Sequence, residues 1–217
     1  MFLTVAIEPS IMRIARQGFT YIGILLLCGF FLAFILPTKW ISVPFFALAF
    51  FVIYFFRDPE RTPPDDPKLL VSPADGKVVY VGPAKDGTPG RTQISIFLSI
   101  FNVHINRSPM TGEITNVRYT PGRFLPAYES EASEKNEQNE MELSDGGWNV
   151  TVRQIAGVVA RRIVFFKKKG DYLKRGERFG LIQFGSRADI VLPQEGNVRV
   201  AEGDKVKGGE TVIVERP

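Results

Sequence analysis

Two long uncharged runs near the N-terminus most restrict how this chain of 217 residues can fold. The first, residues 19–36, holds 18 residues. As an α-helix it would be roughly 27 Å long, close to the thickness of the hydrocarbon core of a bilayer. The second, residues 41–56, holds 16 residues and includes Pro44. We expect residues 19–56 to form an α-helical hairpin that anchors the chain in a membrane, with a re-entrant pair confined to one leaflet as the alternative.

The charges around these runs predict their orientation. Arg13 and Arg16 precede the first run, Arg57 and Arg61 follow the second, and the connection holds only Lys39. Because basic residues favour the cytoplasmic side, both ends of the hairpin and the domain that follows should face the cytoplasm, at the inner membrane. Residues 1–18 would be a cytoplasmic or interfacial segment, since no small-residue cleavage site of a signal peptide follows the first run.

The composition changes after the hairpin. Residues 57–70 carry four prolines and many charges, which indicates an extended linker. From 71 to 217, short runs rich in β-branched residues are separated by Gly, Pro and Asp, as is typical of an all-β domain. The runs are KVVYVG, QISIFLSI, GEITNVRYT, WNVTVRQIAGVVARRIVFF, RFGLIQFG, ADIVLP and ETVIVE. We therefore expect an all-β soluble domain after the linker.

A weak internal repeat lies within this domain. Residues 170–177 and 203–210 share the pattern G-D-x-φ-K-x-G-E, in which φ is an apolar residue. Each copy predicts a tight turn that leads into a strand, with glycine supplying a positive φ angle. Such paired turns resemble the barrel-sandwich hybrid of lipoyl and biotinyl domains, and the resemblance implies that architecture here.

One acidic segment stands out against the basic average of the chain. Residues 128–142 contain six glutamates and one lysine, although the net charge of the whole chain is +4. We expect this segment to be a solvated loop or a short exposed helix.

Several classes of site are excluded by composition. The chain has one histidine, His104, and one cysteine, Cys28, which lies in the first apolar run, so the common Cys/His metal sites and an intramolecular disulfide are excluded. No P-loop, dinucleotide fingerprint or GxSxG elbow is present. Basic and aromatic residues do not interleave as in an RNA-binding surface, so we expect neither a metal nor a nucleic-acid partner.

Three short segments carry residues suited to chemistry. They are Ser72-Pro73-Ala74-Asp75-Gly76, the run FLSIFNVHINRSP around His104, and Phe184-Gly185-Ser186-Arg187 between two strand-like runs. Each has an ordinary interpretation when taken alone: a turn, a buried histidine and a second turn. Their order and spacing together resemble the short bacterial and archaeal members of the phosphatidylserine decarboxylase family, over about residues 57–217.

This resemblance implies a self-processing enzyme. The hydroxyl of Ser186 would attack the carbonyl of Gly185, and the resulting ester would undergo β-elimination, so that Ser186 becomes a covalent pyruvoyl cofactor. Residues 1–185 would form the β chain and residues 186–217 the α chain, and the two chains would stay associated. The pyruvoyl group would form a Schiff base with phosphatidylserine in the membrane, release CO₂ and leave phosphatidylethanolamine.

The resemblance also implies roles for Asp75 and His104. Asp75 is the candidate base for self-cleavage, or the residue that orients the base, and His104 is the candidate acid that protonates the product. The longer enzymes carry a second histidine three positions after the one that matches His104, whereas this chain has Arg107 there. The division of self-cleavage between Asp75 and His104 therefore stays open.

Several basic residues could bring an anionic lipid to the domain. Basic residues are candidates to attract anionic headgroups: Arg57, Arg61, Arg107, Arg123, Arg187 and Lys167 to Lys169. The alternatives are a membrane-tethered, lipoyl-like adaptor or carrier module without catalysis, and the same chemistry on an archaeol-type serine phospholipid. Self-association into a homo-oligomer is left open.

Overall fold

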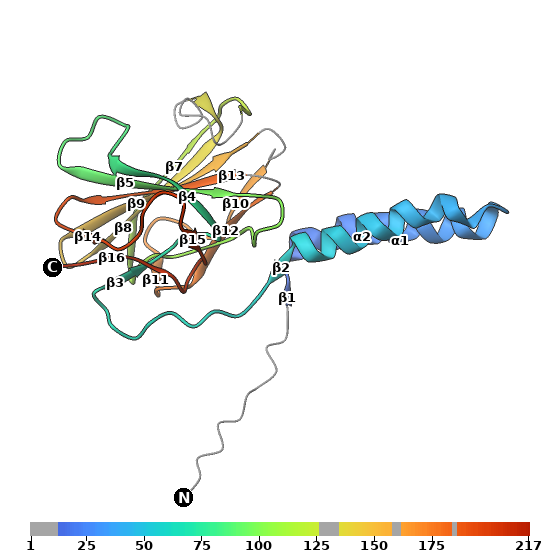
Figure 1. The fold of residues 1–217 in the computed structure, drawn as a ribbon, viewed down its shortest axis with the longest axis horizontal. Helices are drawn as coiled ribbons and strands as arrows, with labels where there is room; N and C mark the ends of the chain where they lie inside the picture. The colour runs from blue at the N-terminus through green and yellow to red at the C-terminus, as the bar shows by residue number, and fades with distance from the viewer. Residues whose placement is uncertain (1–12, 126–134, 158–161, 184–185) are drawn as a thin grey trace, which may run out of the picture. The chain divides into compact units, whose positions relative to one another are not determined.

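The computed structural model describes residues 13–125, 135–157, 162–183 and 186–217 (Figure 1). It divides into two compact units, residues 1–60 and residues 61–217. The first contains the helices and the second contains most of the strands.

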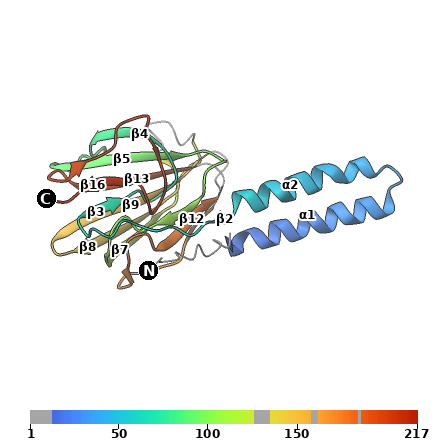
Figure 2. The same cartoon turned by 60° about the horizontal axis from the view of Figure 1, so that its bottom comes forward.

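The N-terminal unit contains two apolar helices that lie side by side (Figure 2). Helix α1 (Arg16–Ile35) is followed by a 3₁₀ turn (Lys39–Ser42) and helix α2 (Val43–Phe55). Pro44 lies in the first turn of α2, where its missing N–H disrupts no helical hydrogen bond. At the base, β1 (Arg13–Ile14) pairs with β2 (Arg57–Asp58). Two apolar helices joined by a short turn agree with the predicted hairpin.

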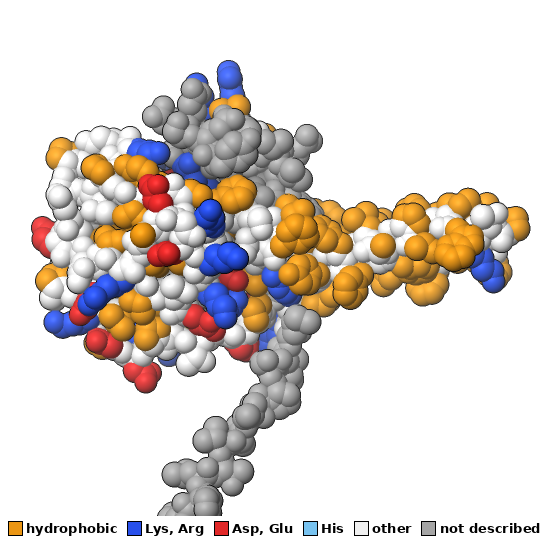
Figure 3. Space-filling view, in the orientation of Figure 1, with side chains coloured by type: hydrophobic (Ala, Val, Ile, Leu, Met, Phe, Trp, Pro, Cys, Tyr) orange, Lys and Arg blue, Asp and Glu red, His pale blue; other side chains and the backbone are white. Residues whose placement is uncertain are grey.

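The surface of this unit is apolar. Phe34 is 92% exposed and Leu27 is 72% exposed, and Figure 3 shows hydrophobic side chains along most of the helical pair. Helix α1 is long and apolar enough to cross a membrane, as judged by length and composition. A surface of this kind weakly indicates membrane association.

The second unit is built mostly of antiparallel β-sheet. The largest sheet has the order β11 (Tyr172–Leu173), β7 (Gly112–Thr120), β8 (Gln138–Asp145), β9 (Trp148–Ala156), β13 (Ser186–Pro193), β5 (Arg91–Leu98), β4 (Gly76–Pro83) and β15 (Lys205–Val206). Two smaller sheets have the orders β10 (Arg162–Phe165), β12 (Arg178–Gln183), β6 (Ile105–Arg107), and β14 (Asn197–Val198), β16 (Val212–Glu215), β3 (Leu69–Val71). The large sheet curls in Figures 1 and 2. The expected β-rich domain is confirmed.

The core lies on the inner face of the large sheet. Alternate residues of β5 and β13 are fully buried there: Ile94, Ile96, Leu98, Ala188, Ile190 and Leu192. Ser186 is paired with Leu98. Directly paired residues of antiparallel strands share a face of the sheet, so the side chain of Ser186 faces the core as well.

The internal repeat extends beyond residues 170–177 and 203–210. In each copy the turn glycine has a positive φ, 89° at Gly170 and 101° at Gly203. The second glycine of each copy donates its N–H to a Ser-Pro segment, from Gly176 to Ser108 O (2.8 Å) and from Gly209 to Ser72 O (2.9 Å). The segments SPADGK (72–77) and SPMTGE (108–113) are therefore also equivalent. Asp75 and Thr111 occupy the same position in the two copies of the repeat.

The interpretation of the acidic segment was wrong for residues 138–142. They belong to β8, in the interior of the large sheet, whereas residues 128–134 lie outside the described part of the chain. The glutamates are compensated across the sheet, because Glu140 is 7% exposed and is paired with both Arg153 and Arg118. Cross-strand ion pairs allow a strand that the composition alone would assign to a loop.

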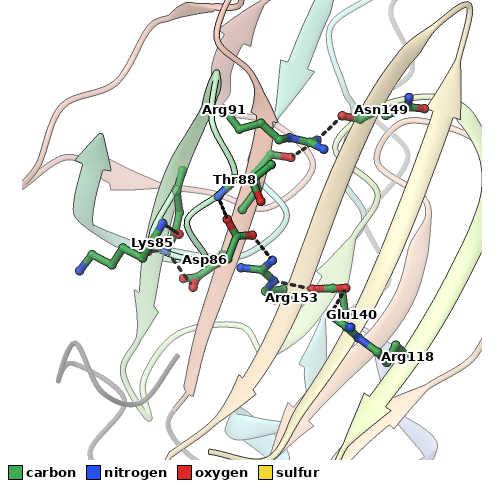
Figure 4. A network of polar contacts seen from close by, with 12 residues as sticks. Lys85, Asp86, Thr88, Arg91, Arg118, Glu140, Asn149 and Arg153 are labelled. Carbon is green, nitrogen blue, oxygen red and sulfur yellow. Dashed lines mark hydrogen bonds and ion pairs between the residues drawn. The ribbon is translucent and has the colours of Figure 1, made fainter. Parts of the chain in front are cut away.

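A polar network holds the β4–β5 connection against the sheet (Figure 4). Asp86 accepts hydrogen bonds from the side chain of Arg153 and from the Thr88 amide (3.0 Å), and Arg153 also binds Glu140. Burial acts to raise the pKa of Asp86, but the bonds from Arg153 and Thr88 outweigh it and lower this pKa to about 2. The contribution of Asp86 to the stability of the folded state is therefore present only while its carboxyl group is ionised.

We predict that this network makes stability acid-sensitive. A carboxylate with a lowered pKa contributes stability above its unfolded value of 3.8, and this contribution is lost as the pH falls through about 2. After allowance for solvent screening, the contribution is about 1 kcal/mol. Urea unfolding, followed by the fluorescence of Trp148 in a Trp40→Phe background, should show a smaller loss of stability for Asp86→Asn than for unchanged Asp86 between about pH 5 and about pH 2. Parallel pH profiles would contradict this assignment.

Candidate active site

Ser186 begins the central strand of the large sheet. Strand β12 ends at Gln183 in a three-stranded sheet, and β13 begins at Ser186 between β5 and β9. Ser186 pairs with Leu98 on one side and Ala156 on the other. Gly185, the other half of the expected cleavage site, lies outside the described residues.

The hydroxyl of Ser186 is in an unusual environment. The residue is 0% exposed, and its Oγ has no hydrogen-bond partner among the described residues. A buried hydroxyl without a partner costs about 1–3 kcal/mol, so such groups are rare in folded proteins. A nucleophile that is kept for a reaction with its own chain is one explanation for this cost.

His104 is held by the turn that precedes β6. The residue is 2% exposed, and its Nδ1 lies 2.9 Å from the carbonyl oxygen of Asn102. Because a carbonyl only accepts hydrogen bonds, Nδ1 carries a proton, and Nε2 is the ring nitrogen that can take up or release one. The carbonyl of His104 accepts the N–H of Ile182 at 3.3 Å, four residues before Ser186 along the chain.

Asp75 is fixed through both carboxylate oxygens. Oδ1 accepts a hydrogen bond from the N–H of Gly208 at 2.7 Å, and Oδ2 accepts one from Nη2 of Arg61 at 3.0 Å. Arg61 also binds Glu210 at 3.0 Å. Asp75 therefore joins a turn of the repeat to a guanidinium group.

The equivalent position in the repeat separates structure from chemistry. Thr111 accepts the N–H of Arg175 through Oγ1 at 3.1 Å, as Asp75 accepts that of Gly208. A neutral hydroxyl is thus sufficient to close this turn. What Asp75 adds is a negative charge and a second acceptor.

The segments that carry the three candidate residues are hydrogen-bonded in series. The N–H of Arg107 in β6 donates to Pro73 O at 2.9 Å, and Ile105 of β6 pairs with Leu181 of β12. Strand β12 then leads towards Ser186. The three motifs, which are separated in the sequence, therefore meet through β6 and β12.

A chain of buried amides was missed from the sequence. Asn139 donates to Gln154 (3.4 Å), Gln154 donates to Asn106 (2.8 Å), and Asn106 donates to Pro73 O (3.5 Å). The three amide residues are at most 5% exposed. The alternation of β9 contained a signal, because Gln154 stands in the inward series with Val150 and Val152. A buried amide in such a series needs polar partners.

Arg187 and Asp189 form an ion pair on the other face of β13. They are 3% and 0% exposed, and Nε of Arg187 lies 2.9 Å from Oδ1 of Asp189. Gln93 of β5 also binds Asp189, at 3.1 Å. Complete burial raises the pKa of Asp189, against the opposing effect of Arg187. The pair fixes the strand immediately after Ser186.

Two basic residues predicted to attract headgroups are buried instead. Arg187 is paired with Asp189, and Arg107, which is 3% exposed, donates to Gly176 O at 2.9 Å. Arg123, by contrast, is exposed. The guanidinium groups of Arg187 and Arg107 therefore lie inside the domain and not on its surface, and their headgroup role stays a prediction.

Among the described residues, metal ligands and cavities do not add to the site around Ser186. Within the described ranges, no three His, Cys, Asp or Glu side chains are grouped so that they could hold a metal ion. A cavity of about 460 Å³ is lined by residues of the β4–β5 connection and Gln194. It lies at the Arg91 end of β5, whereas Ser186 pairs at the Leu98 end.

Comparison with known proteins gives one family. A family model described as phosphatidylserine decarboxylase matches residues 48–214. A phosphatidylserine decarboxylase proenzyme of Geobacter metallireducens is 44% identical over 208 residues, which cover 92% of this chain and 95% of that protein. A proenzyme of the same name from Symbiobacterium thermophilum is 46% identical and covers 94% of this chain and 96% of its own. A third, from Geotalea uraniireducens, is 43% identical.

Proposed function

The chain belongs to the phosphatidylserine decarboxylase family, and from that membership we propose that it cleaves itself between Gly185 and Ser186 and then decarboxylates phosphatidylserine. The observation that carries the proposal is the buried Ser186 hydroxyl, which lacks a hydrogen-bond partner among the described residues. Family membership also argues against an adaptor or carrier module without catalysis. The direct test is the release of CO₂ and phosphatidylethanolamine from phosphatidylserine by the purified full chain.

Self-cleavage requires only groups of the chain and water. Oγ of Ser186 attacks the carbonyl carbon of Gly185, the C–N bond breaks, and the amide nitrogen takes up a proton, so that an ester replaces the peptide bond. A base then removes the α-proton of Ser186, and the ester leaves as the carboxylate of Gly185. Water converts the remaining dehydroalanine to a pyruvoyl terminus and releases ammonia. Residues 1–185 and 186–217 become separate chains.

The fold supports continued association of the two chains. Strand β13 of the α chain lies between β5 and β9 of the β chain, β15 pairs with β4, and β16 pairs with β3. The ion pair of Arg187 and Asp189, together with Gln93, fixes β13 next to the new terminus. Cleavage breaks one bond in a connection between two sheets and leaves these ladders intact.

Decarboxylation would use the group formed at position 186 and the imidazole of His104. A pyruvoyl group at position 186 would supply a ketone that can bind the substrate amine and take up the electrons left when CO₂ departs. His104, with Nδ1 held by Asn102 O, would deliver the proton on Nε2 of its imidazolium form to the α-carbon of the product. Burial of His104 and Ser186 keeps competing water away from the reacting carbon.

We assign the base for self-cleavage to Asp75. Its side chain ends in a carboxylate that can accept a proton, and Arg61 holds Oδ2 of that carboxylate at 3.0 Å. The repeat supplies a sharp test, because Thr111 performs the turn-closing role without a charge. Asp75→Thr should keep the bond to Gly208 and lose the base, and Arg61 keeps Glu210 as a partner. We expect self-cleavage to slow roughly 10²- to 10⁴-fold with little loss of thermal stability.

The matched control is Thr111→Ala. It removes the hydroxyl from the equivalent turn, leaves Asp75 in place and should cleave at the wild-type rate. The measurement is a time course of precursor and products by gel electrophoresis after synthesis in a cell-free system. Normal cleavage of Asp75→Thr would transfer the role of base to His104.

Further assignments extend the same proposal. We infer that residues 1–18 are interfacial, 19–56 anchor the chain in the inner membrane, 57–70 link the parts, and 71–217 form the catalytic domain on the cytoplasmic side. The duplicated turns and Ser-Pro segments support a barrel-sandwich-hybrid relationship. A glycerol-based phosphatidylserine is the proposed substrate, and assays with an archaeol-based serine phospholipid would test the choice of backbone.

A further inference from the structure

The connection from β5 to β6 is a tight turn with an unusual composition. The turn Ser99–Asn102 is closed by a backbone bond (2.9 Å), and Asn102 Oδ1 accepts both the N–H and the hydroxyl of Ser99 (2.9 and 2.8 Å). Its two central residues are Ile100 and Phe101, where turns ordinarily carry Gly, Asn, Asp or Pro. Ile100 is 39% exposed and Phe101 is 61% exposed. The turn therefore fixes two apolar side chains at the surface.

This turn lies at the Ser186 end of the large sheet. Leu98, which precedes the turn, pairs with Ser186. Phe124 reaches the same end by another route, because Asn136 binds both Leu125 and Ala156, and Ala156 pairs with Ser186. Phe124 is 37% exposed, and the exposed Arg123 precedes it.

Exposed apolar residues are concentrated at this end. In the described part of the second unit, residues 61–217, six large hydrophobic residues are exposed: Ile100, Phe101, Tyr119, Phe124, Phe166 and Tyr172. The first four lie near the end of the large sheet at which Ser186 is paired. Tyr119 belongs to this group because it pairs with Asn139, the neighbour of Gln138, and Gln138 pairs with Ile155 beside the partner of Ser186. Tyr172 pairs with Glu113, which lies at the opposite end of the sheet. Single exposed apolar residues are ordinary, but a group of them marks an interaction surface.

We infer that Ile100, Phe101 and Phe124, with Arg123 beside them, form a docking surface for an anionic phospholipid bilayer. Below, these four residues are called the apolar rim. The inference rests on the proposed function. A diacyl substrate stays in the bilayer, whereas Ser186 is fully buried at the end of the sheet that carries the apolar rim. This end of the domain must therefore approach the bilayer for the headgroup to reach Ser186. Aromatic residues at an interface and a cation near anionic headgroups match the chemistry of a bilayer surface.

The rim is connected to the catalytic histidine by one residue. Asn102 closes the turn with its side chain and accepts the Nδ1 proton of His104 with its carbonyl, at 2.9 Å. The turn that touches the bilayer therefore also orients the imidazole. Docking positions the lipid headgroup and His104 relative to the same rigid turn.

The test compares substrate in the bilayer with substrate in solution. Full-length protein is placed in phosphatidylcholine vesicles and given either long-chain phosphatidylserine in the same vesicles or short-chain dicaproyl phosphatidylserine from solution. Phe101→Ser should lower turnover of the bilayer substrate about tenfold, since one aromatic side chain no longer leaves water. Turnover of the soluble substrate should stay at the wild-type value. Phe101→Trp should restore turnover of the bilayer substrate.

The matched control is Tyr172→Ser. Tyr172 is 63% exposed, close to the 61% of Phe101, but lies away from the rim. It should leave both activities unchanged. Equal loss on both substrates for Phe101→Ser, or no loss on either, would overturn the inference. So would a change in oligomeric mass with no change in the activity ratio, which would make the rim a contact between copies. Wild-type protein that is inactive on both substrates would instead overturn the proposed function.

Discussion

Ser186→Ala is expected to remain a single chain of 217 residues without decarboxylase activity. Alanine has no Oγ to attack the carbonyl of Gly185, so neither the ester nor the pyruvoyl terminus can form. The fold should persist, because Oγ has no hydrogen-bond partner to lose among the described residues and the position faces the apolar core. Gel electrophoresis and release of CO₂ measure the two effects, and we expect cleavage to be absent and turnover to be at background.

A suitable control is Ser95→Ala. Ser95 is also buried, on neighbouring β5, but it pairs with Asp189 on the opposite face of the sheet. It should be cleaved into two chains as the wild type is. Two bands from Ser186→Ala would show that the chain is cut by another route and that Ser186 is not the nucleophile.

His104→Gln should separate the two reactions. With Asp75 as the base, the variant is expected to be cleaved and to carry its pyruvoyl group. Turnover should nevertheless fall roughly 10²- to 10⁴-fold, because no other titratable imidazole is present in the chain. Glutamine can still donate to Asn102 O, so the turn beside it keeps its partner. Mass analysis of the α chain and a phosphatidylserine turnover assay on the same sample measure the two steps.

The two outcomes for His104→Gln assign its role. Normal cleavage with slow turnover supports proton transfer during decarboxylation. A precursor that stays intact would place His104 in self-cleavage instead, and the assignment of Asp75 as the base would be wrong.

Apolar patterns predicted the main elements correctly. The hairpin followed from uncharged runs, and the regions around β5, β7, β12 and β13 followed from β-branched runs. These features depend on local composition and on period, which a sequence displays directly.

Features that depend on distant partners were not predictable. Strand β8 appeared to be a solvated segment because its compensating charges, Arg118 and Arg153, come from the neighbouring strands β7 and β9. Burial of Arg187 depends on Asp189, and its local sequence suggested only an exposed cation. The amide chain through Gln154 required the pairing of strands that are far apart in the sequence. In each case tertiary pairing overrides the local polarity of the sequence.

Intact-mass spectrometry of the purified wild-type protein shows whether Ser186 has cut its own chain and become a pyruvoyl group. We expect two chains, residues 1–185 with the free carboxylate of Gly185 and residues 186–217 with a pyruvoyl group in place of an amino terminus. Active protein with the mass of one continuous chain of 217 residues, and an unmodified serine at position 186, would contradict it.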